Sequence, residues 1–244
     1  MEIAADIRER IKAASAVVVL TGAGVSAESG IPTFRGQGGY WKNYRAEDLA
    51  TPQAFARNPG LVWEWYDMRR SLIAKARPNA AHQAIAKLES MVRDFTLVTQ
   101  NIDGLHRRAG SEHILEIHGN IWQARCTECP CVFSEPRDPL PLPDLPVCPH
   151  CGGLARPYVV WFGESYDSEL MVAAQDAIFR ADLLLVAGTS GMVSMPVFLT
   201  RLARDNGALV FEFNLEPSEL TPLAHHLFAG PAGETLPNFV EYFS

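Results

Sequence analysis

No run of this 244-residue sequence is long and apolar enough to span a lipid bilayer. The segment 1–12 mixes acidic and basic residues in helical rhythm, and it has neither the apolar core of a secretory signal nor the acid-poor composition of a transit peptide. Basic residues are also in deficit: 21 Lys and Arg against 28 Asp and Glu give a formal charge of −7, which argues against a general phosphate-backbone binder. We therefore expect a soluble, cytoplasmic protein, a monomer, with no membrane association and no direct nucleic-acid binding.

Cysteine is scarce as well, with five residues in all, but four of them form two C-x2-C pairs, Cys126/Cys129 and Cys148/Cys151. In a reducing compartment such pairs indicate a metal rather than disulfides. Their separation of 18 residues is typical of a ribbon that holds tetrahedral zinc by four thiolates. Because sulfur would fill every position, we expect one structural zinc per chain. A redox pair would need only one such motif, and Cys131 is either a bystander or an alternate ligand.

Apolar residues make up 48% of the chain, enough for the core of one large domain or one domain with an insertion. Four short apolar runs, 16–20, 95–98, 183–186 and 209–213, each lead into polar residues or glycine. Together with helical segments such as 79–92, they predict an α/β fold with a doubly wound, parallel, Rossmann-like sheet. Ligands of such sheets lie beyond the carboxyl ends of the strands, where these polar residues fall.

Two stretches interrupt the alternation of strands and helices. Residues 40–78 are predicted to form short helices, and residues 122–157 contain the cysteine pairs in a proline-rich context. We expect this helical insertion and the zinc-binding segment to build one smaller module. Residues 1–39, 79–121 and 158–244 would then form the large Rossmann-like, nucleotide-binding domain, with a cleft between the two parts.

A glycine loop, Gly22-x-Gly24-x-x-Ala27, follows the first predicted strand and precedes a predicted helix. In this context glycines allow backbone N–H groups to approach a pyrophosphate at a helix N-terminus, although an ordinary tight turn is the alternative. A dehydrogenase would carry a second strand that ends in an acidic residue about 20 positions later. The corresponding region, 41–48, is not strand-like, so the loop indicates a nucleotide site of another kind.

Three polar residues are candidates for chemistry. Asn101 and Asp103 follow a strand two positions apart, so an amide and a carboxylate would face one pocket and bind a carboxamide and ribose hydroxyls. A solvated turn cap is the alternative for these residue types. His118 follows the short apolar run 114–117 and precedes Gly119-Asn120, which presents an imidazole at a strand end as a candidate general base.

The motifs at 22–35, 99–106, 118–120, 159–164 and 188–190 occur in an order that resembles the sirtuins, the NAD-dependent protein lysine deacylases, over nearly the whole chain. Thr33, the 39–41 segment and the Tyr66-x-x-Arg69 pair are similar to class III sirtuins, which include bacterial enzymes and the mitochondrial desuccinylase. Departures occur at Gly191 and Met195, and these put cofactor affinity and peptide preference in question.

The resemblance implies NAD as cosubstrate, with His118, Asn101 and Asp103 as the catalytic residues. The implied NAD-binding residues are Gly22, Ala23, Gly24, Ser26, Phe34, Arg35, Gln100, Asn101, Ile102, Asp103, Gly188, Thr189, Ser190, Asn214, Glu216 and Ala232. The implied substrate-binding residues are Ala46, Tyr66, Arg69, Val160, Phe162, Gly163, Glu164, Gly191, Met192 and Val193. Acyl-lysine proteins or peptides would bind as an added strand between the two loops that contain the last seven.

The family's reaction implies that acyl-lysine and NAD yield lysine, nicotinamide and O-acyl-ADP-ribose, with His118 taking a proton from a ribose hydroxyl. Two other functions on the same fold remain open: an NAD-binding sensor or scaffold without turnover, and a mono-ADP-ribosyltransferase. The intact His118, Asn101 and Asp103 favour the deacylase.

Tyr66 and Arg69 suggest which acyl group is removed. Three positions apart on a predicted helix, their side chains share one face. A core tyrosine beside a surface arginine is the simpler interpretation of the spacing alone. Beside the family pattern, a phenol and a guanidinium would bind a terminal carboxylate of succinyl-, malonyl- or glutaryl-lysine, with Ala46 leaving room for the longer chain.

Overall fold

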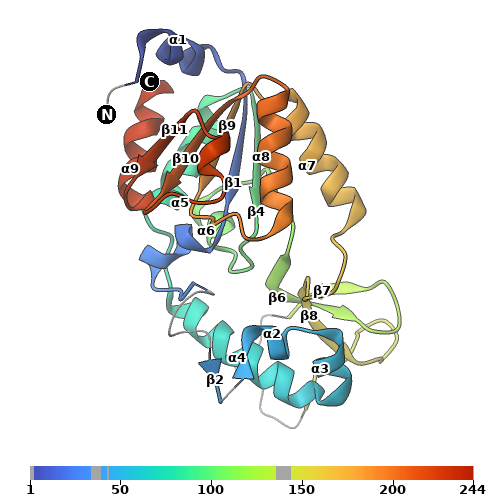
Figure 1. The fold of residues 1–244 in the computed structure, drawn as a ribbon. Helices are drawn as coiled ribbons and strands as arrows, with labels where there is room; N and C mark the ends of the chain where they lie inside the picture. The colour runs from blue at the N-terminus through green and yellow to red at the C-terminus, as the bar shows by residue number, and fades with distance from the viewer. Residues whose placement is uncertain (1–2, 34–39, 43, 136–143, 244) are drawn as a thin grey trace.

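The computed structural model describes residues 3–33, 40–42, 44–135 and 144–243. A large part built around a parallel sheet stands above a smaller part of helices and short strands (Figure 1). No helix in the described part of the chain is long and apolar enough to cross a membrane.

The large part contains a six-stranded sheet in the order β11-β10-β9-β1-β4-β5, and every neighbouring pair is parallel. Its strands are β1 (Ala16–Thr21), β4 (Asp94–Thr99), β5 (Ile114–Glu116), β9 (Leu183–Ala187), β10 (Leu209–Asn214) and β11 (His226–Ala229). The chain starts at the central strand β1, moves outward through β4 to β5, and returns to β9 on the other side of β1. A ligand crevice forms at such a switch point, beyond the carboxyl ends of the strands.

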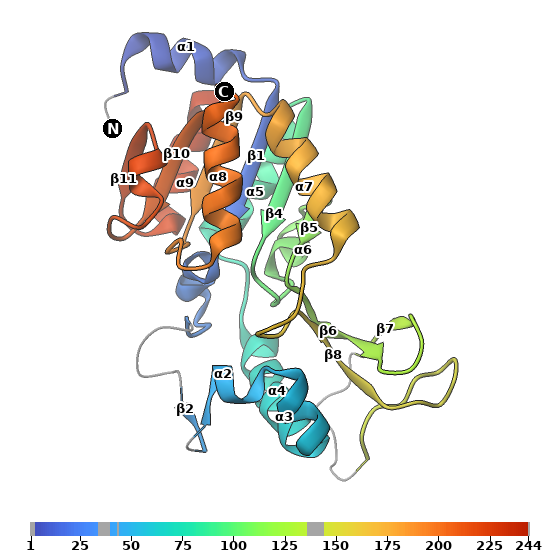
Figure 2. The same ribbon diagram turned by 45° about the vertical axis from the view of Figure 1, so that its right-hand side comes forward.

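Helices cover both faces of this sheet (Figure 2). Val17 and Val19 of β1 pack with residues of α5 (Ala80–Met91) and α9 (Ala232–Val240). The intervening Val18 and Leu20 pack on the other face with residues of α7 (Ser168–Arg180) and α8 (Ser194–Asp205). Burial of both faces explains why the strands read as continuous apolar runs. The predicted doubly wound fold is confirmed.

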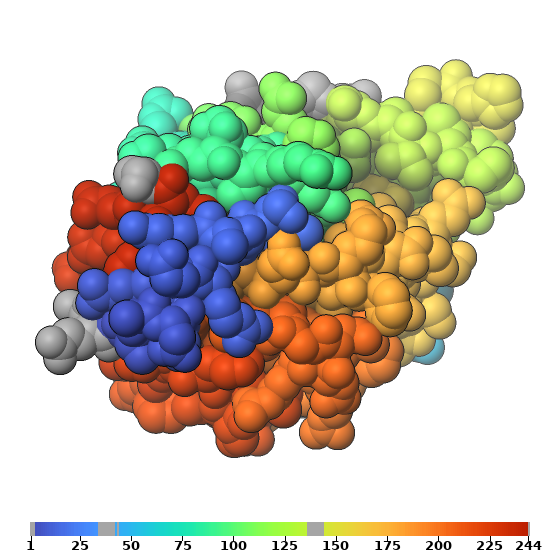
Figure 3. Space-filling model, turned by 90° about the horizontal axis from the view of Figure 1, so that it is seen from above, coloured from blue at the N-terminus to red at the C-terminus, as the bar shows by residue number. Residues whose placement is uncertain are grey.

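The amino ends of the parallel strands lie under the two chain termini. Seen from above, the N-terminal segment lies beside the C-terminal one (Figure 3). Helix α1 (Ala5–Ala13) contacts the short helix η4 (Glu241–Phe243), and the Arg8 guanidinium lies 5.9 Å from the Tyr242 ring centroid. The carboxyl ends therefore point away from the termini, toward the smaller part (Figure 1).

The smaller part combines the two predicted insertions. The first contributes the hairpin β2 (Tyr40–Trp41) and β3 (Tyr44–Arg45), followed by α2 (Ala46–Leu49), α3 (Pro52–Arg57) and α4 (Pro59–Lys75). The second contributes an antiparallel sheet in the order β7-β6-β8, made of β7 (Val132–Ser134), β6 (Gly119–Cys126) and β8 (Ala155–Val159). Both pack into one core, in which Trp63 of α4 donates through Nε1 to the Ala155 carbonyl at 3.0 Å.

Local capping explains where two of these helices begin. The Thr51 hydroxyl accepts from the Ala54 N–H at 3.1 Å, and Asn58 Oδ1 accepts from the Leu61 N–H at 3.0 Å. Each cap is followed by a proline, which lacks the N–H that a first helical turn leaves unpaired. Asn58 is both the residue after α3 and the N-cap of α4, so only one residue separates the two helices.

Some local expectations differ from the structure. The segment after the glycine loop is a 3-10 helix, η1 (Ala23–Ser29), and the first insertion begins with a hairpin and contains one helix of 17 residues rather than short helices alone. The η1 helix ends at Gly30 in the left-handed conformation. Strands β6 and β8 also run across the expected domain boundaries near 122 and 157.

Candidate active site

The glycine loop packs against the loop after β9. A Cβ on Gly24 would lie 2.8 Å from the Gly188 Cα, and one on Gly188, whose φ is +58°, would lie 2.3 Å from the Val25 nitrogen. The N–H groups of Gly22 and Gly24 donate to the Ala187 and Gly188 carbonyls at 3.0 and 2.8 Å. These two N–H groups are therefore already bonded to backbone carbonyls of the described chain and are not available to a phosphate. The glycines are required because the glycine loop and the loop after β9 approach each other closely.

Asn101 and Asp103 converge on the hydroxyl of Ser26. Asn101 Nδ2 donates to Ser26 Oγ at 3.2 Å, and Ser26 Oγ donates to Asp103 Oδ2 at 2.7 Å. Asn101 also donates to the Gly22 carbonyl, and the other Asp103 oxygen accepts from the Leu105 N–H at 2.8 Å. All three side chains are buried, so this is a built polar pocket and not the solvated turn cap weighed above.

Two histidines that sequence reasoning missed lie behind this pocket. His82 Nε2 is 3.5 Å from Ser26 Oγ, and the His106 ring stands 4.7 Å from the His82 ring. Burial, opposed for His82 by the charge of Asp103, lowers the pKa of His82 to about 4. Burial and the neighbouring His82 lower the pKa of His106 to about 3. Both rings are neutral at neutral pH, and the spacing of these residues in the sequence gave no signal of their contact.

Further polar residues connect the strand ends of the large sheet. Gln100 Nε2 donates to Thr189 Oγ1 at 3.0 Å, and Asn214 Nδ2 donates to the Thr189 carbonyl at 2.8 Å. Asn214 also donates to Glu212, a buried acid of β10. The predicted cofactor residues just after β4 and β9 and at the end of β10 are thus connected along one edge of the sheet.

The remaining predicted cofactor residues lie around that edge. Ala232 is the first residue of α9, and the next N–H, of Gly233, donates to Glu28 of η1 at 2.8 Å. Ser190 is half-buried and Glu216 is exposed, while Ile102 packs into the core of the smaller part. Phe34 and Arg35 lie outside the described residues.

His118 occupies the turn between β5 and β6. Its Nδ1 lies 2.9 Å from the Gln100 carbonyl oxygen and its Nε2 lies 3.3 Å from the Tyr166 hydroxyl. A carbonyl only accepts, so Nδ1 carries the proton in the neutral ring and Nε2 holds the lone pair. Burial lowers the pKa of His118, and its hydrogen bond to Gln100 opposes that shift. The residue is therefore a neutral imidazole with a basic nitrogen at neutral pH.

The predicted peptide-binding segments flank His118. The Val160 N–H donates to the His118 carbonyl, and the Phe162 N–H donates to the Ala50 carbonyl, both at 2.9 Å. Glu164 accepts a two-point ion pair from Arg156, with contacts of 2.5 and 2.8 Å. Gly163 is exposed, and so are the Phe162, Met192 and Val193 side chains, with exposed fractions of 54%, 72% and 42%. Gly191 is buried and has a φ of +69°.

Tyr66 and Arg69 share the inner face of α4. Tyr66 is 1% exposed, and its hydroxyl accepts a hydrogen bond from Trp161 Nε1 at 2.8 Å. The Arg69 guanidinium lies 5.2 Å from the Trp65 ring centroid. Burial lowers the pKa of Arg69, while the charges of Tyr66 and Asp103 act to raise it, so the guanidinium lies within electrostatic range of the polar pocket. Arg69 is not the surface arginine of the simpler interpretation.

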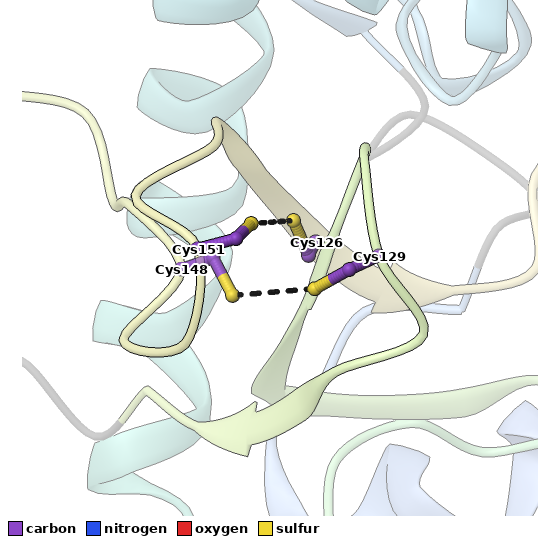
Figure 4. A group of neighbouring side chains, drawn as sticks. All are labelled: Cys126, Cys129, Cys148 and Cys151. Carbon is purple, nitrogen blue, oxygen red and sulfur yellow. Dashed lines mark hydrogen bonds between the residues drawn. The ribbon is translucent and has the colours of Figure 1, made fainter.

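The four cysteines of the two pairs form one cluster (Figure 4). The Cys126 and Cys151 sulfurs are 3.5 Å apart, the Cys129 and Cys148 sulfurs are 3.7 Å apart, and all four lie within 4.8 Å of one another. Tetrahedral zinc at about 2.3 Å from each thiolate places its sulfurs roughly 3.8 Å apart, so the cluster fits this metal. Backbone N–H groups of Glu128 and His150 donate to Cys126 and Cys148. Cys131 is not one of the four clustered sulfurs, and its carbonyl accepts from the Cys126 N–H.

The fold and the site together define a class: a doubly wound nucleotide-binding domain with a structural zinc module and a buried amide, carboxylate and hydroxyl at its switch point. The family model described as "Sir2 family" matches residues 22–195. The chain belongs to this family, and the predicted sirtuin resemblance is confirmed.

Relatives agree over most of their length. The chain is 52% identical over 226 residues to NAD-dependent protein deacylase 2 of Pyrobaculum aerophilum, covering 92% of this chain and 89% of that one. It is 51% identical over 228 residues to the NAD-dependent protein deacylase of Leptospira interrogans serogroup Icterohaemorrhagiae serovar Lai, covering 92% and 91%.

Solved structures agree equally well. A crystal structure of a Sir2 homolog–NAD complex superimposes with a TM-score of 0.92 at 43% identity, covering 99% of this chain and 94% of the other. A Sir2 bound to acetylated peptide superimposes with a TM-score of 0.84 at 27% identity, covering 98% of each. The predictions of NAD as cosubstrate and of one structural zinc are confirmed.

Proposed function

We propose that this chain is an NAD-dependent protein lysine deacylase that removes acyl groups ending in a carboxylate, such as succinyl, malonyl and glutaryl, as well as acetyl. The enzyme class rests on membership of the Sir2 family and on relatives named NAD-dependent protein deacylases that share about half of their residues with it. The acyl preference rests on the half-buried Arg69 and the buried phenol of Tyr66, both on α4.

Bound NAD would supply the ribose carbon to which the acyl oxygen is transferred. Asn101, Asp103 and Ser26 would hold the nicotinamide and the inner ribose, because their donors and acceptors already converge in a buried pocket. Gln100 and Asn214 would bind farther along the cofactor. His118 would take a proton from a ribose hydroxyl at Nε2, since its other ring nitrogen is already committed to the Gln100 carbonyl.

The peptide would bind as an added strand between residues 160–164 and 191–193. Exposed apolar side chains at Phe162, Met192 and Val193 suit a surface that another chain covers. Because Val160 is bonded to the His118 carbonyl, an acyl-lysine entering beside this segment would arrive next to the base.

The terminal carboxylate would bind Tyr66 and Arg69. A tyrosine hydroxyl that accepts from Trp161 still has its own proton to donate, and Trp161 belongs to the proposed peptide-binding segment. The guanidinium carries positive charge close to the same phenol, and charge-assisted bonds to a carboxylate are the strong ones. Ala46 is half-buried beside the same core, and its small side chain would leave room for a longer acyl chain.

Substituting Arg69 tests this preference. Acetyl-, succinyl-, malonyl- and glutaryl-lysine versions of one peptide are followed by mass spectrometry with and without NAD. Arg69→Met is expected to lower kcat/KM for succinyl-lysine by about 10- to 150-fold, the equivalent of one charge-assisted hydrogen bond of roughly 1.5–3 kcal/mol. Deacetylation is expected to persist, because an acetyl group has no terminal carboxylate for Arg69 to bind.

Arg57→Met is the matched control, since Arg57 is exposed on α3 and should alter neither reaction. Equal loss of both activities in Arg69→Met, or a wild-type protein that ignores succinyl-lysine, would leave a plain deacetylase. Nicotinamide release without loss of acyl-lysine would instead indicate ADP-ribosyl transfer.

A further inference from the structure

Tyr166 stands directly against the proposed base. Its hydroxyl is 3.3 Å from His118 Nε2, and the two rings are nearly parallel, at 18°, with centroids 5.5 Å apart. The residue belongs to the connection between β8 and α7, immediately before Asp167, whose carboxylate caps α7 by accepting from the Glu169 and Leu170 N–H groups. The cap fixes the start of α7 next to Tyr166, so the phenol is presented to His118 by a defined backbone.

The contact suits both protonation states of the imidazole. In the neutral ring Nε2 is an acceptor, because Nδ1 donates to the Gln100 carbonyl, and the Tyr166 O–H donates to it. In the imidazolium Nε2 carries a proton, and the phenolic oxygen has lone pairs to accept it. Burial raises the pKa of Tyr166, so the phenol keeps its proton and both roles at neutral pH.

We propose that Tyr166 is a positioning residue of His118, whose hydroxyl donates to Nε2 of the neutral base and accepts from Nε2–H once His118 has taken the ribose proton. This inference rests on the proposed role of His118 as base. The proton is transferred from the ribose hydroxyl to Nε2. Tyr166 changes from hydrogen-bond donor to acceptor and neither gains nor loses a proton. Its ring covers one face of the imidazole throughout.

Tyr166 also has space to yield to a ribose hydroxyl. One side of the residue lines a cavity of about 500 Å³, bounded by Tyr158, Val160 and Leu170 among others. The Tyr166 side chain is therefore not enclosed by packing on every side. It can withdraw when the ribose hydroxyl needs the lone pair and return when the imidazolium has formed.

No charged side chain takes the place of this hydroxyl among the described neighbours of His118. Glu116 of β5 is bonded to Asn120 and paired with Arg107. Asp103, after β4, accepts from Ser26 and Leu105, and Glu164, in the connection to α7, is paired with Arg156. Among the described residues, the partner that the structure gives to Nε2 of the imidazolium is therefore Tyr166.

Tyr166→Phe tests the inference, because it keeps the ring and removes the hydroxyl. The pKa of His118 is measured by NMR in free protein with labelled histidine, with His118→Ala identifying its resonance among the seven histidines. A hydrogen bond to a charged partner is about twice as strong as a neutral one. Removing the hydroxyl therefore destabilises the imidazolium more than it destabilises the neutral imidazole. The pKa of His118 should fall by about 0.4–1 pH unit. The acidic limb of the pH profile of kcat/KM should move to lower pH by the same amount, and kcat at its plateau should fall about 2- to 10-fold.

Tyr158→Phe is the control, since Tyr158 lines the same cavity and should leave the pKa of His118 unchanged. A His118 pKa in Tyr166→Phe that is unchanged or raised overturns the inference. The NMR titration needs neither NAD nor acyl peptide. The two ideas can therefore fail separately. If His118→Ala retained turnover while Tyr166→Phe still lowered the pKa of His118, His118 would not be the base of the proposed function, but its contact with Tyr166 would be established.

Discussion

At the scale of single residues, the candidate site depends on polar groups that fix one another before any ligand arrives. Ser26 bonds to both Asn101 and Asp103, and the Gln100 carbonyl fixes the tautomer of His118. Such groups need no reorganisation when charge develops, which is the advantage of a preorganised site. The cost is that each member is difficult to replace, because its partner would be left buried without a hydrogen bond.

His118→Ala is expected to lower deacylation by roughly 10²- to 10⁴-fold, the usual contribution of a general base. NAD binding and the fold should persist, because the imidazole is a half-buried turn residue and not part of the sheet core. Steady-state kinetics with an acyl peptide and calorimetric titration with NAD measure the two effects. His113→Ala, at a histidine whose side chain is 70% exposed, is the control, and near-normal turnover in His118→Ala would remove this residue from the mechanism.

Some of these site residues could be predicted from the sequence and others could not, for a physical reason. Asn101, Asp103 and His118 follow short apolar runs, so their position at strand ends could be predicted from local pattern. His82 and Tyr166 lie within or beside helices, and their contacts with the site depend on how α5 and α7 pack against the sheet. Neither contact leaves a trace in periodicity or spacing.

At the scale of elements, buried parallel strands were predictable because both of their faces are apolar. The hairpin β2–β3 was not predicted, since each of its strands has only two residues and no alternation to detect. The glycine loop was expected to precede a helix, and the helix that follows it is the 3-10 helix η1, in which Gly24 packs closely against Gly188.

The zinc ribbon leads to a prediction about the smaller part. His118 immediately precedes β6 and Cys126 is its last residue, eight positions later, which is roughly 25 Å along a strand. Elemental analysis should find one zinc per chain. Chelation, or Cys→Ser at any of the four ligands, should unfold this ribbon, because metal binding to such sites is folding energy of about 10–16 kcal/mol in isolated zinc fingers.

Thermal unfolding followed by circular dichroism measures this effect. Cys131→Ser is the matched control, because its sulfur lies outside the cluster and the substitution should leave both zinc content and the unfolding temperature unchanged. Freshly purified protein without zinc, or metal removal with no change in unfolding temperature, would contradict a structural zinc.

At the scale of the whole molecule, the two parts are joined by one core and one buried network. Ile102, from the polar loop after β4, packs with Trp63 and Trp161 of the smaller part. The Ile121 N–H of β6 also donates to the Ile102 carbonyl of that loop at 2.9 Å. The loop that contains Asn101 and Asp103 is therefore held against the smaller part by apolar packing and by a backbone hydrogen bond.

The buried histidines under this pocket make stability depend on pH. An unfolded histidine protonates near pH 6.5, whereas the folded pKa values are about 4 for His82 and about 3 for His106. Below pH 6.5 the unfolded chain therefore binds protons that the folded chain excludes. The stability from burying these rings is fully present above pH 6.5 and is lost as pH falls toward the folded values, by at most about 1.4 kcal/mol per pH unit for each histidine.

Urea unfolding at pH 7 and pH 5 measures the loss, and His106→Gln should reduce the difference between the two free energies by about 1–2 kcal/mol. The variant also changes the contact of His106 Nε2 with the Thr21 hydroxyl, at 3.0 Å, so its absolute stability will fall at both pH values. Only the difference between them isolates protonation. His226→Gln, at an exposed position, should retain the wild-type difference. If His106→Gln retained it too, the acid sensitivity would have to come from groups other than this buried pair.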